Sequence, residues 1–461
     1  MNTFLLLKRT VIIITTLSFL LSCEKDSIVN TVNSEDSNDS NDIEETTTIK
    51  RLSRSKNHLA PDDALIVVSL SDERPITRSL VNSIKDVVTI SDKQGEPAIY
   101  AVNLDDGYVL VSAYKTTPPI LAEISHGSYS LADDNNALSF LIDELTNEVV
   151  KHKSDTLSKK LKMLWSQYEE KESPQINGTR SYSTVWDAIS AYMQMWRNEE
   201  YNVYVLHQQP PGLSNEEYAF LCEYASYYER EGYDYMYYSY ITEKVIGTTL
   251  QKGPYYTTSW GAGYPYYATS SGSFDDATVA VGQLMKYYEY PNNYYWSLMP
   301  NHLTSTDTPN TYITSLLSSV ESSLSTLQSS GQTKPNSVKN YLNTNYYASI
   351  ASHNTASTLS ALDDRDPFIM TGENSSGTIF AWCCDGYQKQ SYHDEYAVWV
   401  IADFAYPDFD YEIANWVYNG QYTLYYYHIN WGNNGNNDGW FMLSDIDYSS
   451  NMKDIIVNGH R

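Results

Sequence analysis

The sequence predicts an α+β protein with more than one domain. Its 461 residues are enough for two or three domains, and 42% of them are hydrophobic, so each domain can bury a core. Short β-rich runs, such as Tyr100–Tyr114, occur along the same chain as apolar helical patterns, such as residues 276–289. Strand-rich and helix-rich segments in one chain favour an α+β architecture.

Charge and aromatic content limit the partners of this protein. The formal net charge is −27, and no basic run occurs beyond the N-terminus, which excludes a nucleic-acid partner because phosphates require clustered Lys and Arg. The chain has 43 Tyr against 10 Phe and 10 Trp. Tyr suits half-wet packing faces and binding surfaces, or it replaces Phe in the core. Both interpretations remain open.

The N-terminal residues predict export. Lys8 and Arg9 precede a short apolar run, residues 11–21, that is followed by Ser22 and Cys23. A secretory signal peptide typically has a positively charged N-terminal region, a short apolar stretch and a small residue before its cleavage site. The segment "LLSC" also resembles the bacterial lipobox. We therefore expect a signal peptide over residues 1–22 and a lipid anchor on Cys23, which makes the protein a membrane-anchored lipoprotein, periplasmic or at the cell surface; the alternative is an ordinary signal peptide.

Residues 23–57 are expected to form an acidic, flexible tether. This segment consists largely of Ser, Asn, Asp, Glu and Thr, and such a composition buries too little apolar surface to offset the entropy cost of ordering the chain. A tether behind a lipid anchor would hold the folded part clear of the membrane.

Residues 58–150 are predicted to form a small α+β unit. Two β-rich runs meet at Asp105-Asp106-Gly107, which is a hairpin signal. The run "PPILAEISHGSYS" predicts a further strand, and residues 136–171 have helical spacing. The unit is therefore expected to end near residue 150, with a helical continuation to about 171.

Residues 151–249 are predicted to be a helical, Tyr-rich connecting segment. Helix-like stretches run from Val185 to Trp196 and from Glu216 to Tyr240. Ser214 and Glu217 precede the second stretch with the spacing of a capping box, which pairs the free amides at a helix start.

The cysteines give no sign of a disulfide or a zinc site. Beyond Cys23 the chain has only Cys222, Cys383 and Cys384, an odd number that rules out complete pairing, and they lack the spacing of zinc ligands. We expect buried, inert thiols, no metal and no cofactor.

Four segments in order carry a resemblance to a known family: "SWGAGYPYY" (Ser259–Tyr267), "DDATVAVGQLMKYYEYP" (Asp275–Pro291), "FAWCCDGY" (Phe380–Tyr387) and "YHINWGNNGNNDGWF" (Tyr427–Phe441). They resemble the streptopain family of papain-like cysteine peptidases. The run "YAVNLDDGYVLVSAYKTTPPILAEISHGSY", residues 100–129, resembles the inhibitory pro-domain of such zymogens. The resemblance implies a pro-domain-like inhibitor unit over 58–150 and a papain-like peptidase domain over 250–461, with residues 388–423 as an insertion.

The resemblance also implies that the catalytic residues have been replaced. Papain-type catalysis needs a thiolate at a helix N-terminus, an imidazole and an oxyanion donor. In this chain Asp276 is found at the nucleophile position, Phe380 at the base position and Ala262 at the oxyanion position, whereas the orienting residue Asn430 and its neighbour Trp431 remain. We therefore expect a degenerate, non-cleaving peptidase domain that binds protein or peptide.

Several features of the degenerate site have alternative interpretations. Asp275 and Asp276 are expected to cap a helix, since a metal site there has no further ligand at a suitable spacing. Aromatic residues either line the cleft or belong to the core: Phe380, Trp382, Trp431 and Trp440. His428 lies two residues before Asn430, so both would face one side of a strand.

Two other functions remain open. One is an active cysteine-type endopeptidase that uses rearranged residues, with Cys222, Cys383 or Cys384 as its nucleophile. The other is a cell-surface adhesion or structural module that makes contact through the Tyr-rich segment.

Overall fold

The computed structural model describes residues 51–71, 84–131, 136–171, 194, 196, 201–231, 237–402, 411–443 and 452–461. The chain divides into two compact units, residues 1–49 and 50–461, and all described residues lie in the second. The predicted signal peptide, Cys23 and most of the tether lie outside the described residues, as does most of the predicted helix Val185–Trp196. None of the described helices has the length and apolar character needed to span a membrane.

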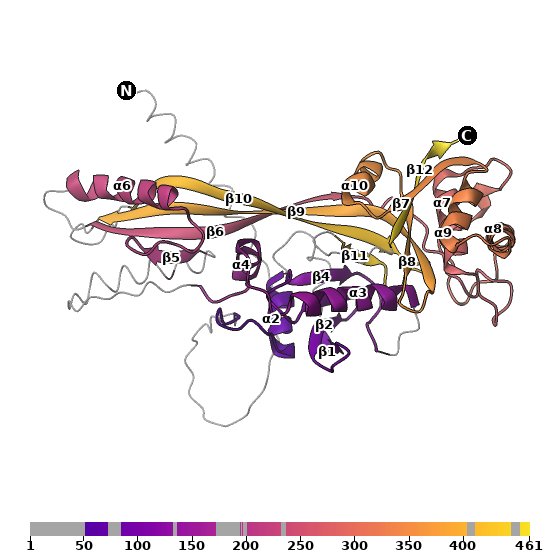
Figure 1. The fold of residues 1–461 in the computed structure, drawn as a ribbon, viewed down its shortest axis with the longest axis horizontal. Helices are drawn as coiled ribbons and strands as arrows, with labels where there is room; N and C mark the ends of the chain where they lie inside the picture. The colour runs from indigo at the N-terminus through magenta and orange to yellow at the C-terminus, as the bar shows by residue number, and fades with distance from the viewer. Residues whose placement is uncertain are drawn as a thin grey trace, which may run out of the picture. The chain divides into compact units, whose positions relative to one another are not determined.

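The described strands form one large antiparallel sheet in a mixed α/β fold (Figure 1). The strands are β1 (Ile84–Ser91), β2 (Pro97–Leu104), β3 (Tyr108–Ser112), β4 (Ile120–Ile124), β5 (Asn202–Val205), β6 (Tyr237–Lys252), β7 (Tyr346–Ser352), β8 (Phe368–Glu373), β9 (Ile379–Ala402), β10 (Tyr411–Asn430), β11 (Gly439–Met442) and β12 (Lys453–His460). Their order is β1-β2-β3-β4-β11-β10-β9-β8-β12-β7, and β6 pairs with both β5 and β9.

Helices pack against several parts of this sheet. The described helices are α2 (Pro61–Ser71), α3 (Asn136–His152), α4 (Lys159–Ser166), α6 (Asn215–Glu231), α7 (Asp276–Tyr288), α8 (Thr311–Ser329), α9 (Lys334–Leu342), α10 (Thr355–Asp363) and the 3₁₀ turn η1 (Trp296–Leu298). Helices α2 and α3 contact the N-terminal strands, whereas α7, α8 and α9 pack on one another and beside β7, β8 and β12 (Figure 1). These two groups cover the two main apolar cores. Helix α6 packs on β6, β9 and β10 over a third, smaller core.

The N-terminal strands confirm the predicted hairpin. Strands β2 and β3 pair antiparallel, with Asn103 opposite Tyr108, and Gly107 between them has a φ of 83°. Strand β4 forms where the run after Pro118 predicts it. The helix expected over residues 136–171 is instead divided into α3 and α4.

The Tyr-rich connecting segment differs from the prediction. Its capping box is confirmed, because the Ser214 hydroxyl accepts from the Glu217 amide at 3.2 Å and the Glu217 carboxylate accepts from the Ser214 amide at 3.0 Å. The predicted helix Glu216–Tyr240 is wrong at its end: α6 stops at Glu231, and residues 237–240 already belong to β6. Tyr, Thr, Val and Ile dominate β6, and these residues favour strands over helices.

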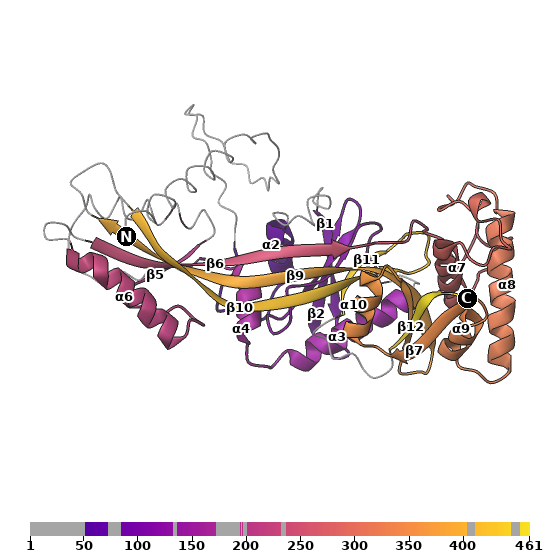
Figure 2. The same ribbon diagram turned by 90° about the horizontal axis from the view of Figure 1, so that it is seen from above.

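The described residues of the predicted insertion 388–423 lengthen two strands of the sheet, and their status as an insertion stays a prediction. Residues 388–402 extend β9, residues 411–423 extend β10, and the two stretches pair with each other in register. Strand β6 pairs along the other edge of β9 from Tyr237 to Lys252. The three strands therefore run side by side over much of their length, as both ribbon views show (Figures 1 and 2).

Candidate functional site

The candidate site begins at the N-terminus of α7. Asp275 is the N-cap residue, and its Oδ1 atom accepts from the Ala277 amide at 3.0 Å. Asp276 is the first helical residue, and its Oδ1 atom accepts from the same amide at 2.6 Å. The predicted capping of this helix is confirmed, since Asp275 is its N-cap residue and both carboxylates accept from the Ala277 amide in the first turn.

A single lysine binds both aspartates. Lys334, the first residue of α9, places its Nζ atom 2.9 Å from Asp275 Oδ2 and 2.9 Å from Asp276 Oδ1. Burial raises the pKa of Asp276 to about 6, and the neighbouring charge of Asp275 adds to this rise, although Lys334 opposes it. Asp276 is therefore mostly ionised above pH 6 and held in an ion-pair cluster. Sequence reasoning did not identify Lys334, because nothing near it in the chain indicates this role.

Asp276 also connects α7 to the sheet. Its Oδ2 atom accepts from the backbone amide of Ala381 on β9 at 2.9 Å. This contact places the Asp276 carboxylate beside Phe380, the residue before Ala381. Both Asp276 oxygens are thus occupied by donors within the chain, so the carboxylate acts as an anchor between α7 and β9.

An aromatic ring from α3 covers the Phe380 position. The Phe140 ring centroid lies 5.8 Å from that of Phe380 and 6.1 Å from that of Trp382. A Cβ atom on Gly372 of β8 would collide with the Phe140 ring, so only glycine permits this approach. Phe380 is consequently only 9% exposed.

Asn430 is buried in a network that contains no histidine. Its Oδ1 atom accepts from Gln283 Nε2 at 2.9 Å, and its Nδ2 atom donates to the carbonyl oxygen of Thr258 at 3.0 Å. Gln283 on α7 in turn accepts from the Trp260 amide at 3.0 Å. In the arrangement observed here, Asn430 therefore links β10, α7 and the segment before Trp260 instead of orienting an imidazole. The sequence signal for this network was a Gln among the apolar residues of α7, and the structure buries this Gln completely.

Trp431 extends the aromatic cluster that starts at Phe140. Its ring lies 5.6 Å from Trp382 and 5.3 Å from Phe441. Trp440 lies apart from this cluster and packs on His428 at 5.0 Å. Phe380, Trp382 and Trp431 therefore belong to one aromatic cluster. Trp440, the fourth aromatic residue that the sequence suggested for a cleft or a core, packs on His428 instead.

Ala262 lies in the loop before α7. It is half-buried, and its carbonyl oxygen accepts from the Phe274 amide at 3.0 Å. Its neighbour Gly261 forms a β-bridge with Asn433, just after Trp431. Hydrogen bonds thus join the Asp276, Phe380, Ala262 and Asn430 segments around the start of α7, and their equivalence to family catalytic positions stays a prediction.

The three thiols differ in their burial in the described structure. Cys383 and Cys384 are completely buried, and Cys383 Sγ donates to the carbonyl oxygen of Ala280 at 3.3 Å. Burial raises the pKa of both thiols well above the ordinary value. Cys222 on α6 is partly buried, and its Sγ atom lies 3.8 Å from the Leu206 carbonyl oxygen. The predicted inert state of Cys383 and Cys384 agrees with this geometry.

His428, which the sequence analysis singles out, and His393 on β9 both have acidic partners. His428 Nδ1 lies 2.6 Å from Asp385 Oδ1, and although burial opposes it, the charge of Asp385 raises the pKa of His428. His393 Nε2 lies 3.0 Å from Glu395 Oε1. His428 and Asn430 both lie on β10 with one residue between them, as the strand prediction requires.

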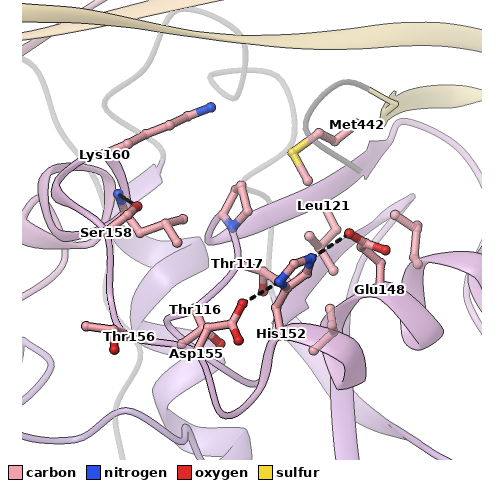
Figure 3. A pocket seen from close by; sticks show the side chains of 14 residues that line it. Thr116, Thr117, Leu121, Glu148, His152, Asp155, Thr156, Ser158, Lys160 and Met442 are labelled. Carbon is pink, nitrogen blue, oxygen red and sulfur yellow. Dashed lines mark hydrogen bonds and ion pairs between the residues drawn. The ribbon is translucent and has the colours of Figure 1, made fainter. Parts of the chain in front are cut away.

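A separate cavity of about 250 Å³ lies among α3, the start of α4 and residues 116–121 (Figure 3). His152 at its wall is held on both sides, with Nδ1 2.6 Å from Asp155 and Nε2 2.8 Å from Glu148. These hydrogen bonds, the one to Asp155 above all, raise the pKa of His152. With both ring nitrogens occupied, His152 is a structural clamp between the end of α3 and the following loop.

Comparison with known proteins identifies the N-terminal part of the described region. Residues 56–149 match the family model described as Spi protease inhibitor. This match supports the inhibitory pro-domain part of the predicted resemblance. We call the segment the Spi-like unit; it contains α2, β1–β4 and nearly all of α3, including Phe140.

Two solved structures give weaker likenesses to this chain. A fragment of Prevotella intermedia prointerpain A is 13% identical to this chain, with a TM-score of 0.39. The match covers 81% of this chain and 98% of the fragment. The active wild-type interpain A cysteine protease of Prevotella intermedia is 15% identical, covers 44% of this chain and 94% of its own, and has a TM-score of 0.28. Scores this low do not establish a common fold. The search among curated proteins found no match.

Proposed function

We propose that this protein is an exported lipoprotein and a pseudopeptidase, which binds a protein or peptide without cleaving it. The observation that supports this proposal is the position of Asp276 and the hydrogen bonds that its carboxylate accepts. Its carboxylate stands where the resemblance expects a thiol, and it accepts hydrogen bonds from Lys334 and from the Ala381 amide.

The chemistry of the site supports a non-cleaving role. Amide cleavage through a covalent intermediate needs a nucleophile, together with an acid that protonates the leaving amine. Both Asp276 oxygens are engaged, and a carboxylate that attacked an amide would form a reactive anhydride. Phe380 beside it can neither accept nor donate a proton. The buried thiols of Cys383 and Cys384 do not supply a thiolate either.

The Spi-like unit supports a binding role for the same region. Its strand β4 pairs with β11, so backbone hydrogen bonds join the unit to the C-terminal strands. Its Phe140 ring covers Phe380 and Trp382. An apolar side chain of a bound peptide would use these rings in place of Phe140, and the Spi-like unit would act as a built-in competitor.

Incubation of the full chain with unfolded casein tests the absence of cleavage. We expect no casein fragments, and a thiol-directed probe should label no cysteine of the folded chain at a rate above that of free cysteine. Casein fragments that disappear when Cys222, Cys383 or Cys384 is replaced by Ala would overturn the proposal in favour of an active enzyme.

Fluorescence anisotropy of labelled, unfolded casein tests the binding role. Phe140→Ala should strengthen binding about tenfold, because the substitution uncovers Phe380 and Trp382. Leu131→Ala is the matched control, since Leu131 lies in the same unit and is 71% exposed. No binding by either variant would contradict a binding role for this region.

The lipid anchor requires a separate test, because Cys23 lies outside the described residues. The exported protein should partition into a detergent phase, and Cys23→Ala should move it to the aqueous phase. Equal partitioning of both proteins would contradict the lipoprotein assignment.

A further inference from the structure

A second pocket lies away from Asp276, between α4 and the strands β5, β6 and β9. Its volume is about 340 Å³, at the lower end of the range for small-molecule pockets. Glu169, Glu243 of β6 and Asp394 of β9 supply acidic side chains to its lining, and Arg54 and the α4 residues Lys159 and Lys162 supply basic ones. The lining of this pocket therefore carries both charges.

Three donors from the sheet satisfy Glu243. Its Oε2 atom accepts from the Tyr204 hydroxyl at 2.7 Å and from Asn202 Nδ2 at 3.2 Å. Its Oε1 atom accepts from the Tyr396 hydroxyl at 3.1 Å. These bonds fix the Glu243 carboxylate, and Arg54 lies in the same network because its Nη2 atom donates to Asn202 Oδ1 at 2.8 Å.

Asp394 differs from Glu243 because its buried oxygen lacks a donor. The residue is 2% exposed, and its Oδ1 atom has no hydrogen-bond partner among the described residues. Burial, and then the charge of Glu243, raises the pKa of Asp394 to about 7, which Lys159 only partly opposes. A buried carboxylate without a donor is costly unless it is protonated or meets a cation. A ligand ammonium at Asp394 would supply the missing donor.

The basic residues of the lining supply the opposite charge. Lys159 Nζ already donates to the carbonyl oxygen of Gly212 at 2.8 Å. Lys162 is exposed, and its ammonium makes no ion pair with the described residues. Leu157, Met163 and Pro211 supply apolar surface to the same lining.

We propose that this pocket binds a small zwitterion of the amino-acid class. The ligand ammonium meets Asp394, the ligand carboxylate points to Lys162, and an apolar side chain packs on Leu157, Met163 and Pro211. This site is independent of the pseudopeptidase proposal, because none of its residues contacts Asp276, Phe380 or Phe140 through a hydrogen bond or ring contact among the described residues.

Titration calorimetry of the full chain with three related probes tests the assignment. Leucine has both charges, 3-methylbutan-1-amine has only the ammonium, and 4-methylpentanoate has only the carboxylate. We expect leucine to bind at least tenfold more tightly than the amine, and 4-methylpentanoate not to bind at about 10 mM, a concentration ten times the Kd of a millimolar ligand.

Variants assign each charge to its partner. Asp394→Asn keeps the shape of the side chain and should weaken both leucine and the amine at least tenfold. Lys162→Met should weaken leucine and leave the amine unchanged. Asp155→Asn, an acidic substitution in the other cavity, is the matched control and should change neither.

Three results would overturn the proposal. The first is no heat from leucine, methionine or lysine at about 10 mM, where a millimolar ligand would be largely bound. The second is equal leucine affinity in Asp394→Asn and the unmodified chain, with thermal unfolding showing that the variant is folded. The third is equal affinity for leucine and the amine. This result would exclude a contact between the ligand carboxylate and Lys162, and therefore a zwitterionic ligand.

Discussion

Asp276 and Asp394 are both aspartates at the edge of a packed core, yet their surroundings differ. Asp276 accepts from Lys334 and from the Ala381 amide, and the ring of Phe140 covers the neighbouring Phe380. Asp394 has a buried oxygen with no donor among the described residues and faces a cavity. The first carboxylate therefore has donors within the chain, whereas the second has a buried oxygen whose donor we propose to be a ligand.

The comparison separates the residues that carry the resemblance from those that line the proposed pocket. The motifs of the resemblance direct attention to the start of α7, where Asp276 has partners within the chain. Asp394 lies on β9 in residues 388–423, which the motifs do not cover. Each prediction below tests one side of this contrast.

Removing the Phe140 ring should have the largest effect. Phe140 is 4% exposed and touches Phe380 and Trp382, so Phe140→Ala should lower the free energy of unfolding by about 3–5 kcal/mol. Urea unfolding measures the change. Leu131→Ala, at a 71% exposed position, should change it by less than about 0.5 kcal/mol. Equal effects in the two variants would mean that the Asp276 region is not closed by Phe140.

Removing the lysine beside Asp276 should have the second-largest effect on the free energy of unfolding. Lys334→Met leaves Asp275 and Asp276 without their shared cation, and we expect a loss of about 3 kcal/mol in the free energy of unfolding. The control is Lys252→Met, because Lys252 forms a more exposed pair with Asp363 and should cost less than about 1 kcal/mol. A Lys334 variant no less stable than the control would contradict the internal role of Asp276.

Replacement by Ala should lower the free energy of unfolding at Asp276 but not at Asp394. Asp276→Ala leaves the Ala381 amide without its acceptor and should cost about 1–3 kcal/mol. Asp394→Ala removes a carboxylate whose buried oxygen has no donor, so the free energy of unfolding should stay the same or rise. Chemical unfolding of both variants at pH 8 measures the pair, and equal losses would remove the contrast.

Asp394→Asn should also change how the free energy of unfolding depends on pH. Folded Asp394 keeps its proton up to a pH of about 7, whereas an ordinary Asp loses its proton near 3.8. The folded state therefore binds more protons between these values, and stability falls as pH rises through this window. Asn does not titrate, so the variant should gain on the unmodified chain by up to about 4 kcal/mol between pH 4 and pH 8. A difference that does not vary with pH would contradict burial of the Asp394 carboxyl.

Local patterns in the sequence were sufficient for part of the fold. The Asp105-Asp106-Gly107 turn, the Ser214 capping box and the start of α7 depend on residues a few positions apart, and all three form as expected. The end of the predicted helix at Tyr240 was wrong, because a run of Tyr has no period that separates a helix from a strand. Pairing with β9 decides this stretch, and that partner lies far away in the sequence.

The candidate site was predictable to a similar extent. Motif positions placed Asp276 and Phe380 together, and the Ala381 amide bond is consistent with this placement. Lys334 lies 58 residues from Asp276, and Phe140 lies in a different part of the chain. Neither belongs to a motif, so only the packing of α9 and α3 brings them to the site. The unpaired oxygen of Asp394 is likewise visible only once its neighbours are placed.

The most direct test of the central claim is to restore the residues that the resemblance expects. A thiol at a helix N-terminus beside an imidazole has a lowered pKa and reacts as a thiolate. In the full chain, Asp276→Cys combined with Phe380→His should therefore react with iodoacetamide at pH 6 at least tenfold faster than Asp276→Cys alone. Equal rates in the two variants, with both folded, would show that positions 276 and 380 do not form a nucleophile–base pair and would contradict the pseudopeptidase account.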